Sequence, residues 1–285
     1  MVTGATSGIG EAIAEDLAQQ GATTLLLSRD EEKCRSTAER IQQKTNNNNV
    51  RYYVADLSSQ EDIRSLTQTL NKDLDRLDVL VNNAGAWFKE RQLSADGVEM
   101  TWALNHLGYF HLTRGLTDLL TQTAAKHGEA RIINQSSLSH KDEGEMHWGD
   151  VELNDWSQAK GSFGAGWGAY LQSKLANVLH AFALARRLES SGVVANAVHP
   201  GVVVTGFTQN NGLFYKTIAP LRRLFNRSTP ADGAAPAVYL ASSAEAAGIT
   251  GSYYGPPQTP EAAHPLAKDE AAQERLWQMS LEYAA

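Results

Sequence analysis

Cysteine is almost absent from this sequence: Cys34 is the only one among 285 residues. A single cysteine excludes an internal disulfide and fits a reducing compartment, so we expect a cytoplasmic protein. Basic residues are also in short supply, with 25 lysines and arginines against 32 aspartates and glutamates and a formal net charge of −7. We therefore expect no broad nucleic-acid-binding surface.

Long apolar runs are missing as well. No stretch approaches the roughly 18 consecutive apolar residues that span a bilayer, so no membrane span is expected. The pattern of a secretory signal peptide is not found either, because a glycine-rich turn begins within four residues of Met1.

Short β-type runs alternate with helical patterns along the chain. The expected strands are residues 22–28, 50–55, 77–82, 130–134 and 193–198. This alternation predicts an α/β fold of the Rossmann type: one doubly wound parallel sheet with helices on both faces. No composition shift divides the chain, which favours a single domain over residues 1–285. The first strand is either unusually short or trimmed, because only Met1 and Val2 precede the glycine-rich turn.

The glycine-rich turn is the segment TGATSGIG, residues 3–10, which leads from that strand remnant into a helical pattern. Gly4, Gly8 and Gly10 allow a tight turn and a close approach to a pyrophosphate, while the helix N-terminus offers free N–H groups. A glycine cluster alone is more often just a turn. Its position between a strand and a helix at the start of a βαβ series favours binding of a dinucleotide cofactor.

This turn resembles the T-G-x-x-x-G-x-G turn of the short-chain dehydrogenase/reductase family. Six more segments resemble motifs of that family in its order: ADL (55–57), NNAG (82–85), NHLG (105–108), INQSS (133–137), YLQSK (170–174) and HPGVVVT (199–205). The tail AQERLWQMS resembles the retinol-dehydrogenase-like and WW-domain-oxidoreductase-like branch. The resemblance implies a cofactor-binding set of Gly4, Thr6, Ser7, Gly8, Ile9, Gly10, Ser28, Arg29, Asp56, Leu57, Asn83, Ala84, Gly85, Tyr170, Lys174, Pro200, Gly201, Val203 and Thr205.

The resemblance also implies where along the cofactor some of these residues lie. Asp56 accepts a hydrogen bond from the adenine amino group, with the backbone of Leu57 beside it; its alternative role is a cap at the end of a strand. Residues 83–85 flank the adenine ribose, unless they form only an Asn-rich turn. The Pro200–Gly201 turn and Thr205 lie near the nicotinamide amide.

The end of the second expected strand bears on the choice between NAD and NADP. Asp30 lies about 20 positions after Gly10, where an acidic residue would bind the ribose 2′-hydroxyl and favour NAD. Ser28 occupies the strand tip, however, and in the family an arginine such as Arg29 binds the 2′-phosphate of NADP. Since Asp30 can instead cap the following helix, we expect NADP.

Tyr170 and Lys174 are four residues apart, which places them on one face of a helix. That spacing also fits an exposed amphipathic pair, but the resemblance implies that Tyr170 is the acid–base group. A lysine cation, with the oxidised nicotinamide, would lower a tyrosine pKa from its usual value near 10. The resemblance further implies that Ser137, rather than Ser136, stabilises the substrate oxygen. Asn105 would order a relay water, or be only a polar residue inside a helix.

Two long segments interrupt the alternation of strands and helices. Residues 138–169 separate Ser137 from Tyr170, where much of the family has about a dozen residues; the retinol-dehydrogenase-like branch carries a similar insertion. His140 and His147 in this insertion are expected at the surface, and no metal site is expected because no ligand cluster accompanies them. Residues 206–229 are expected to form a lid over an apolar substrate.

Together these expectations describe an NADP-dependent oxidoreductase that moves a hydride between nicotinamide and a carbonyl or alcohol carbon. The substrate would be a small apolar compound such as a retinoid, steroid, lipid aldehyde or polyketide ketone. Two alternatives stay open: a non-redox step such as isomerisation or cyclisation, and a non-catalytic NADP sensor. The resemblance also implies pairing into a homodimer or homotetramer.

Overall fold

In the computed structural model, which describes residues 1–142, 146–151, 165–203 and 228–283, eight strands form one sheet in the order β3-β2-β1-β4-β5-β6-β7-β8. They are β1 (Val2–Thr3), β2 (Thr24–Ser28), β3 (Val50–Val54), β4 (Val79–Asn82), β5 (Ala130–Gln135), β6 (Val193–Val198), β7 (Tyr253–Gly255) and β8 (Thr259–Pro260). Neighbouring strands are parallel except β7 and β8. The order 3-2-1-4-5-6 of the first six strands confirms the predicted doubly wound sheet.

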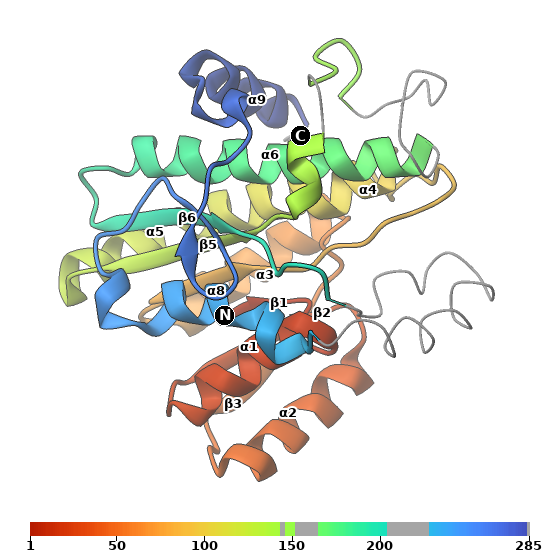
Figure 1. Cartoon of the computed structure of the whole chain (residues 1–285). Coiled ribbons are helices and arrows are strands. Elements are labelled where there is room, and N and C mark those ends of the chain that lie inside the picture. The colour runs from red at the N-terminus through yellow and green to blue at the C-terminus, as the bar shows by residue number, and fades with distance from the viewer. Residues whose placement is uncertain (143–145, 152–164, 204–227, 284–285) are drawn as a thin grey trace.

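Helices cover both faces of this sheet (Figure 1). The α-helices in the described ranges are α1 (Gly8–Gln19), α2 (Glu31–Thr45), α3 (Gln60–Asp73), α4 (Met100–Trp102), α5 (Gly108–His127), α6 (Ala165–Arg187), α8 (Pro230–Ser242) and α9 (Glu270–Glu282). A π-helical turn, η1 (Ala103–Leu107), joins α4 to α5, and the 3₁₀ turns are η2 (Leu138–Asp142), η4 (Ala244–Ala246) and η5 (Pro265–Lys268). Helices α3, α5 and α6 lie on one side of the sheet and α1, α2 and α8 on the other.

Alternating strand residues build the two hydrophobic layers between helices and sheet. Leu25 and Leu27 of β2 belong to the buried cluster that contains Leu112 of α5, whereas Leu26 belongs to the cluster with Ile13 of α1. Side chains alternate between the faces of a strand, so a strand that is apolar on every residue needs cover on both sides. The continuous apolar run of β2 thus follows from its central place in a two-sided sheet.

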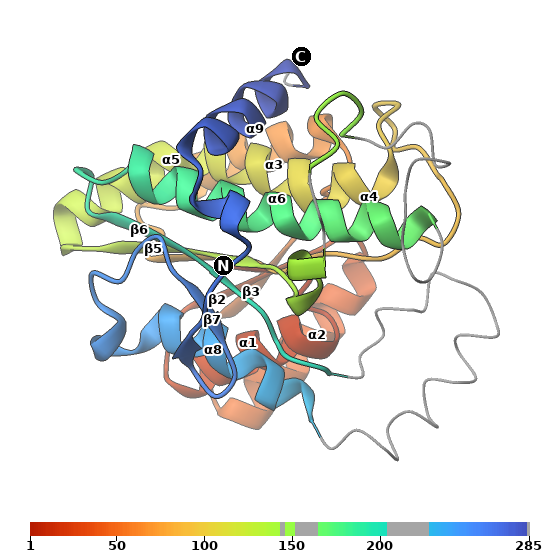
Figure 2. The same cartoon turned by 45° about the horizontal axis from the view of Figure 1, so that its top comes forward.

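The C-terminal helix forms a further layer outside α6. Leu276 of α9 packs in a buried cluster with Leu175 and Leu179 of α6 and with Trp102 of α4. Figure 2 shows α9 lying against the outer side of α6. Helix α6 is therefore covered by the sheet on one side and by α9 on the other, and its polar residues between Gln172 and His180 are withdrawn from solvent.

Local signals in the sequence place several helix ends. Asp30 accepts a hydrogen bond from the backbone N of Lys33 (3.1 Å) and caps α2, as predicted. Gly21, with φ of 88°, follows the end of α1 in the left-handed region, which suits glycine. The first strand is only Val2–Thr3, but it is buried between β2 and β4.

The two long segments begin and end differently from the prediction. Residues 165–169 are the start of α6, so the expected insertion 138–169 is too long at its C-terminal side. Thr229, assigned to the lid, is instead the N-cap of α8 and accepts from the backbone N of Asp232. Residues 143–145 and 152–164 lie outside the described residues, as do residues 204–227, which include the 206–227 part of the predicted lid. Within the described ranges, no helix has the length and apolarity that crossing a membrane requires.

Leu80 offers a test of the core, because its side chain is fully buried in the central strand β4. Leu80→Ala should lower the free energy of unfolding by about 2–5 kcal/mol, from lost apolar burial and the cavity left behind. Leu93→Ala is the matched control: Leu93 is 50% exposed and its truncation should change stability by about 0.5 kcal/mol or less. Urea unfolding of both variants measures the difference; equal effects would contradict the assigned core.

Candidate active site

The predicted site residues gather where the central strands end. The glycine-rich turn follows β1, residues 83–85 follow β4, Ser137 follows β5 and the Pro200–Gly201 turn follows β6. Since these strands are parallel, their carboxyl ends share one edge of the sheet. The chain reverses its winding between β1 and β4, and folds of this kind bind ligands at that point.

The glycine-rich turn is packed directly against residues 83–84. Thr3 Oγ1 accepts hydrogen bonds from the backbone N of Asn83 (2.8 Å) and of Ala84 (2.9 Å). A Cβ on Gly4, which has φ of 63°, would lie 2.8 Å from Ala84 Cα, and one on Gly10 would collide with Gly4 O and the Asn83 amide. These positions require glycine, and they leave the N-terminus of α1 uncovered by side chains of the turn, which fits a pyrophosphate.

The tip of β2 lies next to this turn and is followed by Arg29, an exposed arginine. Thr6 Oγ1 donates to Ser28 Oγ (3.2 Å), which ties the turn to the strand tip. Arg29 is exposed and forms no hydrogen bond or ion pair with another described residue. Asp30 is engaged elsewhere: its carboxylate pairs with Lys33 Nζ (2.9 Å), and this contact lowers the pKa of Asp30. The guanidinium of Arg29, and not the carboxylate of Asp30, is thus available to bind a ligand at the strand tip.

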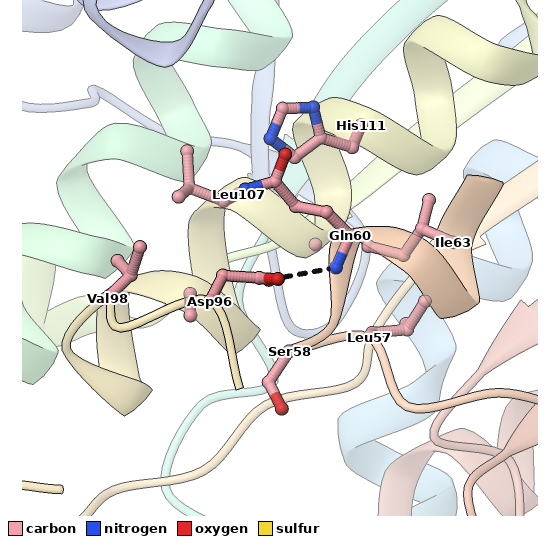
Figure 3. A pocket seen from close by; sticks show the side chains of 10 residues that line it. Leu57, Ser58, Gln60, Ile63, Asp96, Val98, Leu107 and His111 are labelled. Atoms are coloured by element: carbon pink, nitrogen blue, oxygen red, sulfur yellow. Dashed lines mark hydrogen bonds between the residues drawn. The ribbon is translucent and has the colours of Figure 1, made fainter. Parts of the chain in front are cut away.

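The predicted adenine contact is engaged with its own loop. Asp56 Oδ1 accepts from the backbone N (2.9 Å) and the hydroxyl (2.7 Å) of Ser58, which is the capping role considered as its alternative. A small pocket of about 190 Å³ adjoins this loop (Figure 3). Its lining is Leu57, Ser58, Gln60, Ile63, Asp96, Val98, Ala103, Leu107, Gly108 and His111. The pocket contains none of the predicted catalytic residues, so it marks the packing of α3 against α5 rather than the chemistry.

Tyr170 and Lys174 lie on α6 and are buried, with relative exposures of 7% and 3%, so they are not an exposed amphipathic pair. Lys174 Nζ donates to the carbonyl of Gln135 (3.1 Å) and lies 5.7 Å from the ring centroids of both Tyr109 and Tyr170. A Cβ on Gly85 would lie 3.3 Å from Lys174 Nζ. The absence of a side chain at Gly85 therefore makes room for the lysine.

Ser137, and not Ser136, is brought to Tyr170. The Ser137 hydroxyl forms a hydrogen bond with the Tyr170 side chain and another with Ser139 Oγ (3.1 Å). Ser136 is buried and donates to the backbone carbonyl of Lys174 (2.7 Å), which anchors β5 to α6. The two neighbouring serines thus have different partners, and the role of Ser137 at the substrate oxygen stays a prediction.

Asn105 lies in the π-helical turn η1 and holds the loop after residue 85. Its Oδ1 accepts from Ala86 N (2.9 Å), and its Nδ2 donates to Ala86 O (2.9 Å) and to Ser173 Oγ (3.0 Å). Ser173 in turn donates to the carbonyl of Tyr170 (2.8 Å). The amide therefore connects the loop to α6, one turn from Lys174; its predicted role in ordering a relay water stays a prediction.

Burial shifts the pKa values of Tyr170 and Lys174 in opposite directions. Desolvation raises the pKa of Tyr170 to about 12, although the hydrogen bond from Ser137 acts the other way. Desolvation also lowers the pKa of Lys174 to about 7. The predicted lowering of the Tyr170 pKa requires the charged lysine together with a bound oxidised nicotinamide, so it stays a prediction.

Two tryptophans complete the surroundings of Tyr170 and were not predicted as site residues. The ring of Trp167, three residues earlier on α6, stacks on Tyr170 with centroids 5.2 Å apart. Trp87, which follows the NNAG segment, meets Trp167 edge-on at 5.6 Å. Trp167 lies three residues before Tyr170 on the same helix, so its contact with the tyrosine could have been predicted from the sequence. The contact of Trp87 depends on tertiary structure and could not. Together they make one side of the tyrosine apolar.

The segment after β6 carries the remaining predicted contacts. Gly201, with φ of 70°, donates its backbone N–H to His199 Nδ1 (3.0 Å) and closes the Pro200–Gly201 turn. Val203 is partly buried, and Thr205 lies outside the described residues. Among the described residues, no group of three or more His, Cys, Asp or Glu side chains could hold a metal ion.

His140 corrects a prediction. Expected at the surface, it is fully buried, and its Nδ1 lies 2.6 Å from the carbonyl of Ser137. The residues that cover it, Tyr253 and His264, come from the C-terminal part of the chain, so a local reading of the insertion could not reveal its burial.

Lys174 makes stability depend on pH in a defined direction. Its pKa is about 7 in the folded protein and 10.5 in an unfolded reference, so unfolding takes up a proton and stability rises with pH between those values. Lys174→Met should raise the free energy of unfolding at pH 7 by about 2–4 kcal/mol, and this advantage should shrink toward pH 9.5. Urea unfolding across this range measures it, with exposed Lys72→Met as control; a pH-independent difference would contradict the burial of the amine.

Comparison with known proteins agrees with this geometry. A sequence model of the family described as short chain dehydrogenase matches residues 1–148. Human retinol dehydrogenase 13 is 38% identical over 284 residues, covering 97% of this chain and 81% of its own. An uncharacterized protein from Mycobacterium paratuberculosis has a TM-score of 0.74 at 29% identity, covering 99% of this chain and 91% of its own. The RhlG/NADP active-site complex of Pseudomonas aeruginosa has a TM-score of 0.69 at 29% identity, covering 90% and 93%. The chain belongs to the short-chain dehydrogenase family, in its retinol-dehydrogenase-like branch.

Proposed function

We propose that this protein is an NADP-dependent oxidoreductase that interconverts a carbonyl and an alcohol on a small apolar substrate. Membership of the family supports an oxidoreductase that transfers a hydride. The observation that carries the proposal is the buried pair Tyr170 and Lys174, with Ser137 bonded to the tyrosine, beside a turn with no room for a side chain at Gly4 and Gly10. We further propose that the chain is one catalytic domain.

Residues along the strand ends would hold the cofactor. The turn around Gly4 and Gly10 would receive the pyrophosphate, and the segment from Asn83 to Gly85 and the Pro200–Gly201 turn would flank the two nucleoside halves. A bound nicotinamide supplies the hydride in carbonyl reduction and accepts it in alcohol oxidation. The protein's own task is to orient the substrate, exclude water and move one proton.

Tyr170 is the residue that moves that proton. In reduction its hydroxyl donates the proton to the substrate oxygen, while the Ser137 hydroxyl donates a hydrogen bond to the same oxygen as negative charge develops. A tyrosine with a pKa of about 12 holds its proton firmly at neutral pH. Lys174 in its charged form, 5.7 Å from the tyrosine ring centroid, stabilises the tyrosinate that is left behind.

The tip of β2 supports NADP rather than NAD. An exposed arginine with no described partner follows Ser28, while the nearby Asp30 is committed to capping α2. A guanidinium forms paired, charge-assisted hydrogen bonds with phosphate. The Pseudomonas relative is described with NADP in its active site, which agrees with this assignment.

The rings around Tyr170 support an apolar substrate. Trp167 stacks on the tyrosine and Trp87 packs against Trp167, so a substrate that reaches the hydroxyl would meet aromatic surface. A relative that is 38% identical is named as a retinol dehydrogenase, an enzyme of an apolar alcohol.

Location in the cytoplasm and pairing into dimers or tetramers stay predictions; a sedimentation mass near 31 kDa would contradict the pairing.

Tyr170→Phe tests the chemistry. With a panel of apolar aldehydes and ketones, the variant should consume NADPH about 10²–10⁴-fold more slowly than the wild type while binding NADPH equally well, because only the acid–base hydroxyl is lost. Tyr52→Phe, on β3, is the matched control and should be unaffected. Product formed without net NADPH consumption would indicate an isomerase or cyclase instead. Tight NADPH binding with no turnover on any compound would favour a sensor.

Arg29→Gln tests the cofactor choice. Losing the guanidinium should raise the KM for NADPH by roughly 10- to 150-fold, the usual worth of a hydrogen bond to a charged group. The KM for NADH, which has no 2′-phosphate, should stay unchanged. Arg35→Gln removes another exposed arginine, on α2, and should alter neither value. A wild type that prefers NADH would refute the NADP assignment without affecting the assignment of Tyr170.

A further inference from the structure

A cluster of polar side chains, in which His140, His199 and Tyr253 are buried, contacts the backbone of Ser137, and the C-terminal hairpin supplies part of it. Strands β7 and β8 pair antiparallel, and Glu261, the next residue after β8, donates its backbone N–H to Tyr253 O (2.8 Å). The Glu261 side chain then reaches two other parts of the chain. Its Oε1 meets His199 Nε2 at 2.9 Å and its Oε2 meets Lys141 Nζ at 3.0 Å.

His199 connects this carboxylate to the Pro200–Gly201 turn. Its Nδ1 accepts the backbone N–H of Gly201 (3.0 Å), so that nitrogen carries no proton, and Nε2–H is the donor to Glu261. The bond from residue 201 back to the side chain of residue 199 closes the turn as an asparagine side chain does in an Asx-turn. The arrangement leaves no space at Gly255, where a Cβ would collide with both His199 and Glu261.

His140 makes the corresponding connection to Ser137. Its Nε2 accepts from the backbone N of His264 (3.1 Å), so the proton is on Nδ1 and is donated to the Ser137 carbonyl (2.6 Å). The hydroxyl of Tyr253 donates to the same carbonyl (3.3 Å). The Tyr253 ring also contacts both imidazoles, with its centroid 5.2 Å from that of His199 and 4.7 Å from that of His140.

We propose that His199, His140 and Glu261 are positioning residues that hold the Pro200–Gly201 turn and Ser137 in fixed relation to each other. The inference rests on the proposed function: the turn would lie at the nicotinamide end and Ser137 at the substrate oxygen. None of the three touches reacting atoms in this arrangement. His199 acts through the Gly201 N–H and His140 through the Ser137 carbonyl, while Glu261 acts through the side chain of His199.

Burial keeps His199 neutral against the pull of the neighbouring carboxylate. Burial lowers its pKa, and the Lys141 cation acts in the same direction, while the Glu261 carboxylate raises it. His140 and Tyr253 face it as uncharged rings, since burial lowers the pKa of His140 to about 4 and raises that of Tyr253. Protonation of Nδ1 would remove the acceptor for the Gly201 N–H. The turn should therefore be intact at neutral pH and lost as the pH falls through the His199 pKa.

Two substitutions at position 199 separate its two bonds. His199→Asn places an amide oxygen where Nδ1 accepts and gives up Glu261, whereas His199→Gln keeps a donor near Glu261 and gives up the acceptor. The KM for NADPH should rise about tenfold in His199→Gln, the worth of one hydrogen bond, and less than about threefold in His199→Asn. His127→Asn, at the exposed end of α5, is the control for replacing a histidine. Equal KM values in the Asn and Gln variants would overturn the role of the Gly201 bond.

His140 should affect a different kinetic constant. His140→Asn keeps a donor toward the Ser137 carbonyl and His140→Leu removes it, so the leucine variant should lower kcat about tenfold at unchanged KM for NADPH, with the asparagine variant between it and the wild type. A rise in the KM for NADPH with unchanged kcat would contradict the assignment of His140 to Ser137.

The protonation pattern can be measured without turnover. In wild-type protein labelled with ¹⁵N-histidine, long-range ¹H–¹⁵N spectra should show His199 protonated on Nε2 and His140 protonated on Nδ1 at pH 7, with resonances assigned from the variants. The opposite tautomer at either residue would overturn the inference even in a fully active enzyme. A wild type with these tautomers but no turnover on any carbonyl would refute the proposed function and leave the cluster standing.

Discussion

The burial of one amine constrains the rest of the site. Lys174 Nζ is almost fully withdrawn from water, and its hydrogen-bond acceptor among the described residues is the Gln135 carbonyl at the end of β5. Removing an ammonium group from water is costly, which is why its pKa falls to about 7. The lysine stays there because α6 packs along β5 with Lys174 at the end of that strand, Gly85 leaves room, and two tyrosine rings face the amine.

This constraint explains why so many polar groups around the site are used for backbone positioning. Ser136 anchors α6 to the end of β5, Asn105 joins the loop after Gly85 to α6, and Thr3 holds residues 83 and 84 against the glycine turn. Each buried polar atom needs a partner, and here the partner is usually a peptide group of a neighbouring strand end. The result is a rigid edge on which Ser137 and Tyr170 meet.

Much of the fold could be predicted because its signals are local. Leu26, Leu80 and Ile132 lie in short runs of consecutive apolar residues within their strands. Asp30 and Gly21 mark helix ends, and the glycine turn admits no other residue at position 10. Strands β7 and β8 were missed because they span three and two residues, too short for any periodicity. Their register depends instead on β6, more than fifty residues earlier.

The site was predicted less completely than the fold, because part of its chemistry depends on contacts between residues far apart in the sequence. Motif order correctly paired Ser137 with Tyr170, because both belong to local patterns that survive in the sequence. The burial of His140 was predicted wrongly, since it depends on how much water distant segments exclude. Burial likewise raises the pKa of Tyr170 in the chain alone, whereas its lowering beside a bound nicotinamide stays a prediction. Spacing shows which groups are near each other, whereas desolvation depends on the packing of the whole chain.

Residues after position 148, which the family model does not match, contribute much of the proposed site. The family model matches residues 1–148, which contain the glycine turn, Asn105 and Ser137. Tyr170 and Lys174 come from α6, which α9 covers, and the backbone on either side of the site is held by groups as late as Glu261. Relatives could keep the nucleotide-binding half and still differ in the residues behind Ser137 and Gly201. Differences there would change the geometry between cofactor and substrate without touching a motif residue.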